Sequence, residues 1–447
     1  MKKTGRNLYR QRLLAIALPI IMNNIIAQLQ MIIDRIFLGH ANDLYMSALG
    51  NVSSPVWTTM SFCNSLVMGA SILISQSVGA GKREDIGEYA GAMMKYNNII
   101  PVFLCVFWLF FPKPVFTLLG VSDSVMSLCL SYVRWYAPLF LLTGLGGSLG
   151  VVLQTSNYTR PLVVYGLFRS GLNMFLDWVL IFGKFGMPEL GIEGAAIATV
   201  IAEYVGAIYI SVIYFTSKKL TTRPRWNDVK RGHFRSYLHS AKLGINIALE
   251  DFAWNIGNLI MIRILNSINE YAAGIYTIVF GVEVLAVVII GAIGSGTMTL
   301  TSEATGKRDL AQYKGTTLCA FGICVIVTLL MILGAVLFPE QILSLFTSDK
   351  AIIASSGIYL LMIGFNLFSK SGNIIVGNAI RGSGNTKWML YTQIFGTIWI
   401  VSVAAVFVFV CKLGILGVFL AVMVDEGVRA LINLWKYLRI VKEWKSA

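Results

Sequence analysis

The chain has 447 residues, of which 56% are hydrophobic and 13% are charged, and its mean hydropathy is +0.71. Charged side chains make up about a quarter of an ordinary soluble protein, so this composition excludes a water-soluble fold. The formal net charge of +14 would fit a nucleic-acid-binding protein, but the positions of the basic residues point instead to a membrane protein.

Apolar runs long enough to span a bilayer follow one another along the whole chain. A transmembrane helix needs about 20 mostly apolar residues. We expect twelve such helices, and therefore an all-α polytopic membrane protein. The predicted spans are residues 13–38, 48–79, 91–111, 125–153, 160–183, 191–216, 240–266, 271–301, 315–338, 351–378, 386–411 and 413–438.

The basic residues lie mostly in alternate loops between these spans. The two tails, the segment 217–242 and the loops on the same side hold most of them, whereas the opposite loops hold only Lys113, Lys184, Lys350 and Lys412. Cytoplasmic loops of membrane proteins are enriched in lysine and arginine. We therefore expect a multi-pass protein of the cell membrane with both termini in the cytoplasm. No cleavage site follows the polar residues 1–12, so the first helix should be retained.

Two segments about 225 residues apart are variants of one another. Gly-Lys-Arg-Glu-Asp at residue 81 returns as Gly-Lys-Arg-Asp at residue 306, and Leu-Gly-Ile-Glu-Gly at residue 190 returns as Leu-Gly-Ile-Leu-Gly at residue 413. This duplication predicts two pseudo-symmetric lobes of six helices, related by an axis along the membrane normal. The predicted N-lobe is 1–216, the cytoplasmic linker 217–239 and the C-lobe 240–447.

Acidic side chains inside the predicted spans are few, and each costs about 2.5 kcal/mol or more at the bilayer centre. Asp34 lies 15 residues after Pro19, which removes a backbone hydrogen bond and should act as a hinge in the first helix. A broken helix beside an acid is a common ion-site arrangement in transporters. The alternative is that Asp34 reaches the outer membrane surface and pairs with Arg35.

A polar stripe runs along the span 160–183. Arg169, Asn173 and Asp177 recur at every fourth position, so their side chains share one helix face. Asn173 and Asp177 can offer an amide oxygen and a carboxylate oxygen to one small cation. The alternative is a structural network in which Arg169 neutralises the stripe.

Glu203 and Glu426 occupy equivalent positions in the two repeats, because the second motif pair has an offset of 223 residues. Such a pair would line the two lobes equivalently, which makes Glu203 a further candidate of the coupling site. In the C-lobe, Asp425 precedes Arg429 by four residues, which favours a structural ion pair on that helix.

The C-lobe holds three further acidic candidates. Glu250 and Asp251 are adjacent and point about 100° apart, so at most one faces a given cleft. Glu283 is isolated among valine and isoleucine residues and is a candidate proton carrier. The alternative is a neutral Glu283 that hydrogen-bonds to a neighbouring helix.

Aromatic and methionine side chains are numerous enough to line an adaptable cleft for cationic drugs. The alternative is that most of them face lipid or the core. The candidates are Trp57, Met60, Tyr136, Trp254 and Tyr276.

Sequence motifs of soluble enzymes are missing. The chain contains no GxxxxGK[ST], no HExxH and no paired Cys/His spacing, and its six cysteines are scattered through apolar spans. We therefore expect neither an enzyme nor a resident cofactor or metal.

Several motifs together resemble the multidrug and toxic compound extrusion (MATE) family over essentially the full chain. The resemblance implies a V-shaped pair of lobes that alternates between inward-open and outward-open clefts. It also implies export of organic cations and other amphipathic compounds against influx of sodium or protons. The motifs are Ala17-Leu18-Pro19 followed by Asp34 and Gly39, Gly79-Ala80-Gly81-Lys82-Arg83, Asn173 with Asp177 before Gly191-Ile192-Glu193-Gly194-Ala195-Ala196-Ile197-Ala198-Thr199, and Arg381-Gly382-Ser383-Gly384-Asn385-Thr386.

In the family, the first-lobe cation site uses an aspartate of helix 1, an asparagine and an aspartate of helix 5 and a threonine of helix 6. The resemblance assigns these roles to Asp34, Asn173, Asp177 and Thr199.

The chain also departs from the family pattern. Asn246 replaces a proline of helix 7, and the span 351–378 has no acid, which puts a second-lobe sodium site in doubt. Glu250 and Glu283 remain as substitutes.

The sequence thus predicts a cation-coupled antiporter that uses protons or sodium, with small-molecule drugs as substrates. We expect a monomer that contacts membrane lipid and has no nucleic-acid partner. Two alternatives stay open. A lipid-linked oligosaccharide flippase of the same superfamily would need a strongly cationic cleft, whereas the basic residues deep in the spans are Arg169, Arg263, Lys370 and Arg429. A non-transporting membrane scaffold would not need buried carboxylates.

Overall fold

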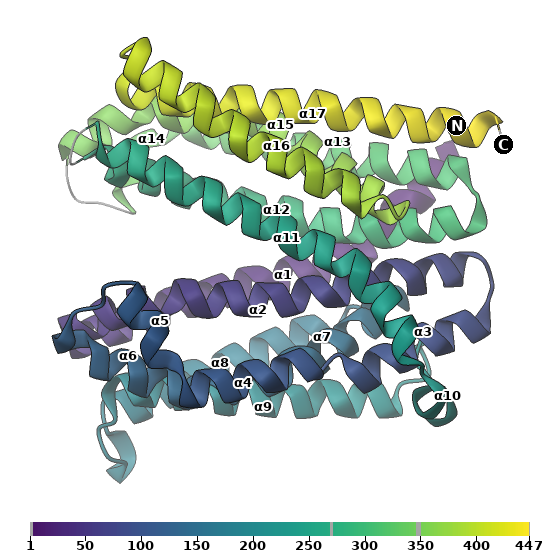
Figure 1. The fold of residues 1–447 in the computed structure, drawn as a ribbon, viewed down its shortest axis with the longest axis horizontal. Helices are drawn as coiled ribbons and strands as arrows, with labels where there is room; N and C mark the ends of the chain where they lie inside the picture. Colours follow the sequence, from purple (N-terminus) through teal and green to yellow (C-terminus); the bar gives the residue numbers. More distant parts are fainter. Residues whose placement is uncertain (1–2, 269–270, 346–349, 447) are drawn as a thin grey trace. The chain divides into compact units, whose positions relative to one another are not determined.

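The computed structural model describes residues 3–268, 271–345 and 350–446. Within these ranges the chain consists of helices joined by short turns and contains no β-strand (Figure 1). Helices satisfy every backbone hydrogen bond within one segment, which is what a chain without water around it requires. The all-α fold predicted from the sequence is therefore confirmed.

The first half of the chain forms α1 (Lys3–Ala41), α2 (Asp43–Gly79), α3 (Arg83–Tyr96), α4 (Ile99–Phe110), α5 (Pro112–Leu118), α6 (Asp123–Tyr136), α7 (Leu139–Thr155), α8 (Pro161–Ile181), a 3₁₀ turn (Lys184–Gly186) and α9 (Gly191–Thr216). The second half forms α10 (Trp226–Arg231), α11 (Phe234–Asn266), α12 (Ala272–Lys307), α13 (Leu310–Leu337), α14 (Pro339–Ser344), α15 (Lys350–Gly382), α16 (Thr386–Ala405), a π-helical turn (Val406–Val410) and α17 (Gly414–Ser446).

Local sequence explains several helix ends. Pro161 opens α8, where its missing N–H costs nothing because first-turn donors lack helical partners. At the start of α13, the Asp309 side chain accepts a hydrogen bond of 2.9 Å from the backbone nitrogen of Gln312. Between α15 and α16 the chain turns at Gly384, whose φ of +89° suits glycine.

Eight helical segments of the described chain are long and apolar enough to cross a membrane, and α6 with α7 gives a ninth span if this pair, bent by 43°, counts as one. The remaining predicted spans coincide with α8, α11 and α17, which carry most of the charged residues named above. The chain is a polytopic membrane protein, and the number of twelve spans stays a prediction.

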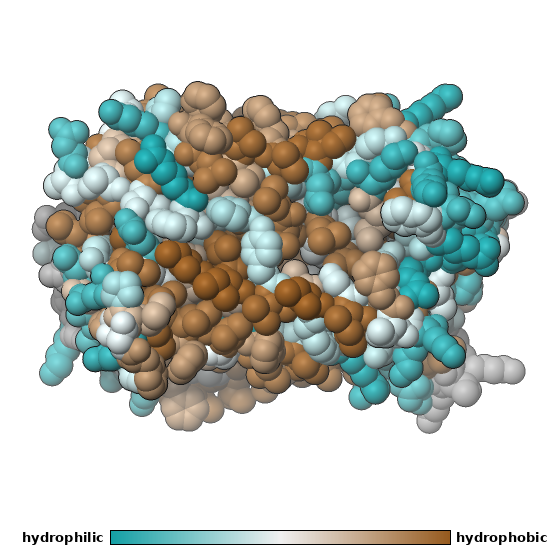
Figure 2. Space-filling view, turned by 90° about the horizontal axis from the view of Figure 1, so that it is seen from below, coloured by the Kyte–Doolittle hydropathy of each residue, from teal (hydrophilic) through white to brown (hydrophobic). Residues whose placement is uncertain are grey.

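Exposed apolar side chains give the surface the character expected next to lipid. In Figure 2 the middle of the face is mostly hydrophobic, while hydrophilic side chains gather towards both ends. Exposed residues of this kind include Phe103 and Phe110 of α4 and Ile208 and Phe215 of α9.

The helices group into two compact units. Unit 1 consists of residues 1–17, 75–81 and 249–447, and unit 2 of residues 18–74 and 82–248. In unit 1, α15 packs against α12, α13 and α17, and α16 packs against α17 (Figure 1). In unit 2, α9 packs against α6, α7 and α8, and α3 packs against α10.

Three helices begin in one unit and end in the other, since the unit boundaries fall inside α1, α2 and α11. In α1 the boundary lies between Ala17 and Leu18, directly before the buried Pro19. Proline removes one backbone hydrogen bond from a helix and weakens it there. The hinge role of Pro19, like the lobe limits at 216 and 240, stays a prediction.

Candidate functional site

Four of the polar residues singled out in the sequence lie together in unit 2. The carboxyl groups of Asp34 on α1 and Asp177 on α8 are hydrogen-bonded to each other. One end of the Asn173 amide is 3.3 Å from Thr199 Oγ1, and the other end is 3.0 Å from Asp34 Oδ1. When the nitrogen occupies this second end, it donates to the Asp34 carboxyl oxygen. Side chains from α1, α8 and α9 thus converge on one point.

Local packing explains the close approach of α1 and α8. Asn173 and Asp177 are one helical turn apart, so both can face α1 at once. Two turns earlier, Gly166 is packed so tightly that a Cβ would lie 2.5 Å from Asn23 Oδ1 of α1. A larger residue at Gly166 would push α1 away from α8, and with it Asp34.

Asp177 is buried and Asp34 is half-buried, and neither has an ion-paired basic partner in the described part of the chain. Asn173 and Asp177 are 0% exposed. Among the described residues neither Asp34 nor Asp177 forms an ion pair with a basic side chain, and Asp177 Oδ1 has no hydrogen-bond partner. Two ionised carboxylates side by side would repel each other strongly at low dielectric. The pair can therefore be occupied by a proton or by one small cation.

Two further residues complete this polar centre and were missed in the sequence. Gln30 lies one turn before Asp34 on α1 and is buried, and its Oε1 accepts a hydrogen bond of 2.7 Å from the Ser170 hydroxyl of α8. The four-residue spacing between Gln30 and Asp34 was a usable signal, because such residues share one helix face.

Arg169 belongs to a separate network. It donates to Glu203 of α9 and forms an ion pair with it. The Tyr165 hydroxyl donates to the other Glu203 oxygen at 2.5 Å, and the guanidinium of Arg169 lies 5.4 Å from the centre of the Tyr165 ring. Glu203 is therefore held by two donors from α8. Its charge is balanced by Arg169, so this arginine does not pair with the stripe below it.

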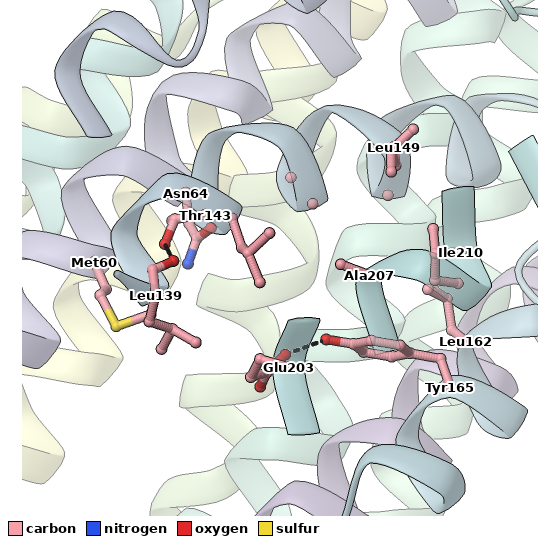
Figure 3. A pocket seen from close by; sticks show the side chains of 14 residues that line it. Met60, Asn64, Leu139, Thr143, Leu149, Leu162, Tyr165, Glu203, Ala207 and Ile210 are labelled. Atoms are coloured by element: carbon pink, nitrogen blue, oxygen red, sulfur yellow. Dashed lines mark hydrogen bonds between the residues drawn. The ribbon is translucent and has the colours of Figure 1, made fainter. Parts of the chain in front are cut away.

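A cavity of about 190 Å³ opens beside this network within unit 2 (Figure 3). Met60, Tyr165 and Glu203 contribute a thioether, an aromatic ring and a carboxylate to its wall. Three glycines of α7 line it beside leucines and a threonine of the same helix, and a Cβ added at two of them, Gly146 or Gly150, would meet no atom within 4 Å. Drug-sized ligands occupy about 300–1,000 Å³, so this cavity has room for one part of such a molecule. Its wall suits a flat, cationic group.

The residues predicted to line a substrate cleft come from both units. Met60 lines the unit 2 cavity, and the Tyr136 hydroxyl contacts its sulfur at 3.7 Å. Trp57 is 69% exposed. Trp254 and Tyr276 line a smaller cavity of about 40 Å³ in unit 1.

The acidic candidates of α11 and α12 lie in unit 1, and two of them have basic partners there. Glu250 Oε1 is 2.5 Å from the Arg381 guanidinium, and Glu283 Oε1 is 2.7 Å from Lys370 Nζ. Asp251 is half-buried. Both pairs join residues far apart in the sequence, which is why Glu283 looked isolated before the fold was known.

Comparison with known proteins identifies the family. The MatE family model matches residues 19–179 and 247–408 of the chain. The chain belongs to the MatE family. The two matched segments are of nearly equal length, and each begins in a helix that crosses between the two units, α1 and α11. Members of this family are secondary transporters rather than enzymes.

Curated relatives cover almost the whole chain. "Probable multidrug resistance protein NorM" of Thermotoga maritima is 28% identical over 446 residues, which cover 96% of this chain and 92% of that protein. "Uncharacterized transporter YisQ" of Bacillus subtilis is 23% identical and covers 92% of this chain and 89% of its own length.

Solved structures share the fold. A MATE family multidrug resistance transporter of the MOP superfamily in an outward-facing conformation has a TM-score of 0.90 at 19% identity, covering 98% of this MatE chain and 97% of its own. A crystal structure of MATE in complex with MaD3S has a TM-score of 0.89 with the same coverage. The chain thus has the fold of the solved MATE proteins.

Proposed function

We propose that this MatE protein is an antiporter that exports organic cations and amphipathic compounds, driven by the influx of protons or sodium. One observation carries the proposal: the carboxyl groups of the half-buried Asp34 and the buried Asp177 lie together, and no basic side chain of the described chain forms an ion pair with either. A carboxyl pair in this setting costs free energy unless it has an occupant. A travelling cation is an occupant that can also leave.

In the proposed cycle a proton or sodium ion enters from outside and neutralises the Asp34–Asp177 pair. Helix α1 then changes its bend at Pro19, and the substrate is released outward. Release of the cation to the inside restores the charge and resets the transporter. Cation and substrate influence each other only through their different affinities for the two conformations.

Both coupling ions are compatible with the residues present. A proton shared by Asp34 and Asp177 would form the hydrogen bond between their carboxyl groups. Sodium would find hard oxygen ligands in the two carboxylates, the Asn173 amide and the Thr199 hydroxyl. We further propose that Glu203 and the cavity beside it hold the cationic part of the substrate during export.

Ethidium efflux from membrane vesicles tests the proposal and separates the two ions. Vesicles loaded with ethidium receive a pH gradient or a sodium gradient, each in the absence of the other. Efflux driven by one of them identifies the coupling ion. Absence of efflux under both gradients, with the protein present in the vesicles, contradicts the antiporter.

The flippase alternative has little support from the basic residues. Arg169, Lys370 and Arg429 are each ion-paired with a carboxylate, so a pyrophosphate would have to displace these partners. Within the described chain, Arg263 is the exposed exception among the basic residues named above. A scaffold without transport activity would not need the Asp34–Asp177 pair, whose placement inside the membrane costs free energy.

We also propose that both termini lie in the cytoplasm, because the basic loops are on the same side as the tails. We further propose that the protein works as a monomer. With the exposed Cys411 replaced by serine, a cysteine introduced at Lys445 should react with a membrane-impermeant maleimide only after intact cells are permeabilised. Light scattering of the purified protein should give the mass of one chain. Labelling of intact cells or a dimer mass would contradict these two expectations.

A further inference from the structure

Five charged side chains form a cluster in unit 1. Lys370 Nζ of α15 is 2.7 Å from Glu283 Oε1 of α12. On α17, the Arg429 guanidinium is 2.8 Å from Asp425 Oδ2 and 3.0 Å from Glu426 Oε1. The side chains of this cluster are between 1% and 13% exposed. Water therefore screens these charges very little, and their balance has to be achieved within the protein.

The charges of the cluster do not balance, because three carboxylates face two basic groups. An uncompensated charge in a protein interior is costly, and a buried carboxylate avoids this cost by taking up a proton. The charged groups around the cluster do not supply the missing positive charge. Glu250 of α11 is paired with Arg381 of α15, and Asp251 beside it adds a further negative charge near the same arginine.

Hydrogen bonds indicate which carboxyl group holds the proton. The Glu426 carboxylate has two donors, Arg429 and, at 2.6 Å, Asn373 Nδ2. Asp425 is 2% exposed and uses only Oδ2, which accepts from Arg429. Its Oδ1 is buried and has no hydrogen-bond partner among the residues that the structure describes. Glu283 is engaged by Lys370 at 2.7 Å, so Asp425 Oδ1 is the position left for a proton.

A small cavity for proton exchange lies beside the Asp425 side chain. Asp425 lines the unit 1 cavity of about 40 Å³ together with Trp254, Tyr276 and Gln393. This volume holds a water molecule but no drug-sized ligand. Gly396 of α16 keeps the place open, because a Cβ there would lie 3.0 Å from Asp425 Oδ1.

We propose that Asp425 is a second exchangeable proton site, located in unit 1 and separate from the Asp34–Asp177 pair. Sodium does not fit this position, because a metal cation needs several oxygen ligands whereas Oδ1 is a single free oxygen beside the Arg429 guanidinium. The charge count makes Glu283, Lys370, Glu426 and Arg429 the groups that control how tightly Asp425 holds its proton.

Infrared difference spectroscopy of the purified full-length protein in sodium-free buffer tests this site, with the carboxyl carbons of aspartate isotopically labelled. We expect the wild type to show a C=O band of protonated, isotope-labelled aspartate. In Asp425→Asn the intensity of this band should fall by the contribution of one carboxylic acid. Asp123→Asn is the control, because Asp123 is an exposed aspartate at the start of α6, and it should leave the band unchanged. An unchanged band in Asp425→Asn overturns the proposal.

A second variant tests the charge count with Asp425 in place. Glu283→Gln removes one negative charge, so Asp425 should ionise and the same band component should disappear. Persistence of that component in Glu283→Gln contradicts the argument, even if Asp425→Asn does not fold. Loss of the Asp425 component of the wild-type band when sodium is added would assign Oδ1 to sodium and overturn the proton site. These measurements do not require transport, so they stand apart from the efflux assay.

Discussion

Asp34 and Asp177 share a hydrogen bond between their carboxyl groups, although 143 positions separate them in the chain, and the neighbouring Arg169 is bound to Glu203 instead. The relationship matters because a pair without a fixed counter-charge can bind and release a cation. If Arg169 had paired with Asp177, the stripe on α8 would be neutral and inert. Because Arg169 pairs with Glu203, the Glu203 carboxylate has a fixed counter-charge and the Asp34–Asp177 pair does not.

Asparagine at either carboxyl position should abolish coupled export. Asp34→Asn and Asp177→Asn keep the side-chain size but remove the exchangeable proton and the negative charge. We expect ethidium efflux to fall to the level of cells that lack the transporter, with the protein still present in the membrane. Fluorescence efflux assays and immunoblots of membranes measure both quantities.

Asp123→Asn is the matched control, because Asp123 is an exposed acid at the start of α6. Wild-type efflux in Asp34→Asn or Asp177→Asn would refute the site.

Breaking the Arg169–Glu203 pair on one side should destabilise unit 2. Both side chains are less than one-fifth exposed, at 13% and 19%. Removal of one partner of a buried pair costs about 3–5 kcal/mol because a buried charge is left without compensation. We therefore expect Glu203→Gln to lower the thermal unfolding midpoint of the purified protein clearly.

The double variant Arg169→Met/Glu203→Gln provides the control for this pair. It removes both charges, so it should recover most of the lost stability. If Glu203→Gln and the double variant were equally unstable, the ion pair would not be the source of the effect.

Filling the unit 2 cavity from α7 should reduce substrate affinity without harming the fold. A Cβ at Gly146 meets no atom within 4 Å, so the leucine of Gly146→Leu can point into the cavity that Glu203 lines. We expect a several-fold higher ethidium concentration for half-maximal transport at an unchanged unfolding midpoint. Gly144→Ala, two residues earlier on α7, should instead destabilise, because its Cβ would lie 2.1 Å from Asn98 Oδ1. An unchanged transport curve in Gly146→Leu would place the substrate elsewhere.

The sequence predicted the helices well because lipid restricts the choices. A segment of about 20 apolar residues that must satisfy its own backbone can only be a helix. The three predicted spans that are less apolar, in α8, α11 and α17, each contribute to ion pairs inside the units. The charged residues that make these pairs also lower the apolar character of the three helices.

Pairings within one helix could be predicted, whereas pairings between helices could not. The four-residue spacing predicted that Asn173 and Asp177 share a face and that Asp425 meets Arg429, and the ion pair of the latter two is 2.8 Å long. Spacing alone cannot show that Lys370 lies beside Glu283, since 87 residues separate them. Contacts of this kind depend on which helices pack together, and a single sequence does not contain that information in its local pattern.

Close packing of α2 against α12 supports a last prediction. Gly306 of α12 lies so near α2 that an added Cβ would be 1.8 Å from the Gln76 carbonyl oxygen, and both residues belong to unit 1. Backbone atoms cannot move aside as a flexible side chain can, so Gly306→Ala should force the two helices apart and cost about 1–3 kcal/mol.

Gly291→Ala on the same helix is the control. Its Cβ would meet no atom within 4 Å, and alanine favours a helix over glycine by up to about 1 kcal/mol. Thermal unfolding of both purified variants should therefore show a lower midpoint for Gly306→Ala and an equal or higher one for Gly291→Ala. Equal midpoints for the two variants would mean that α2 and α12 do not meet at Gly306.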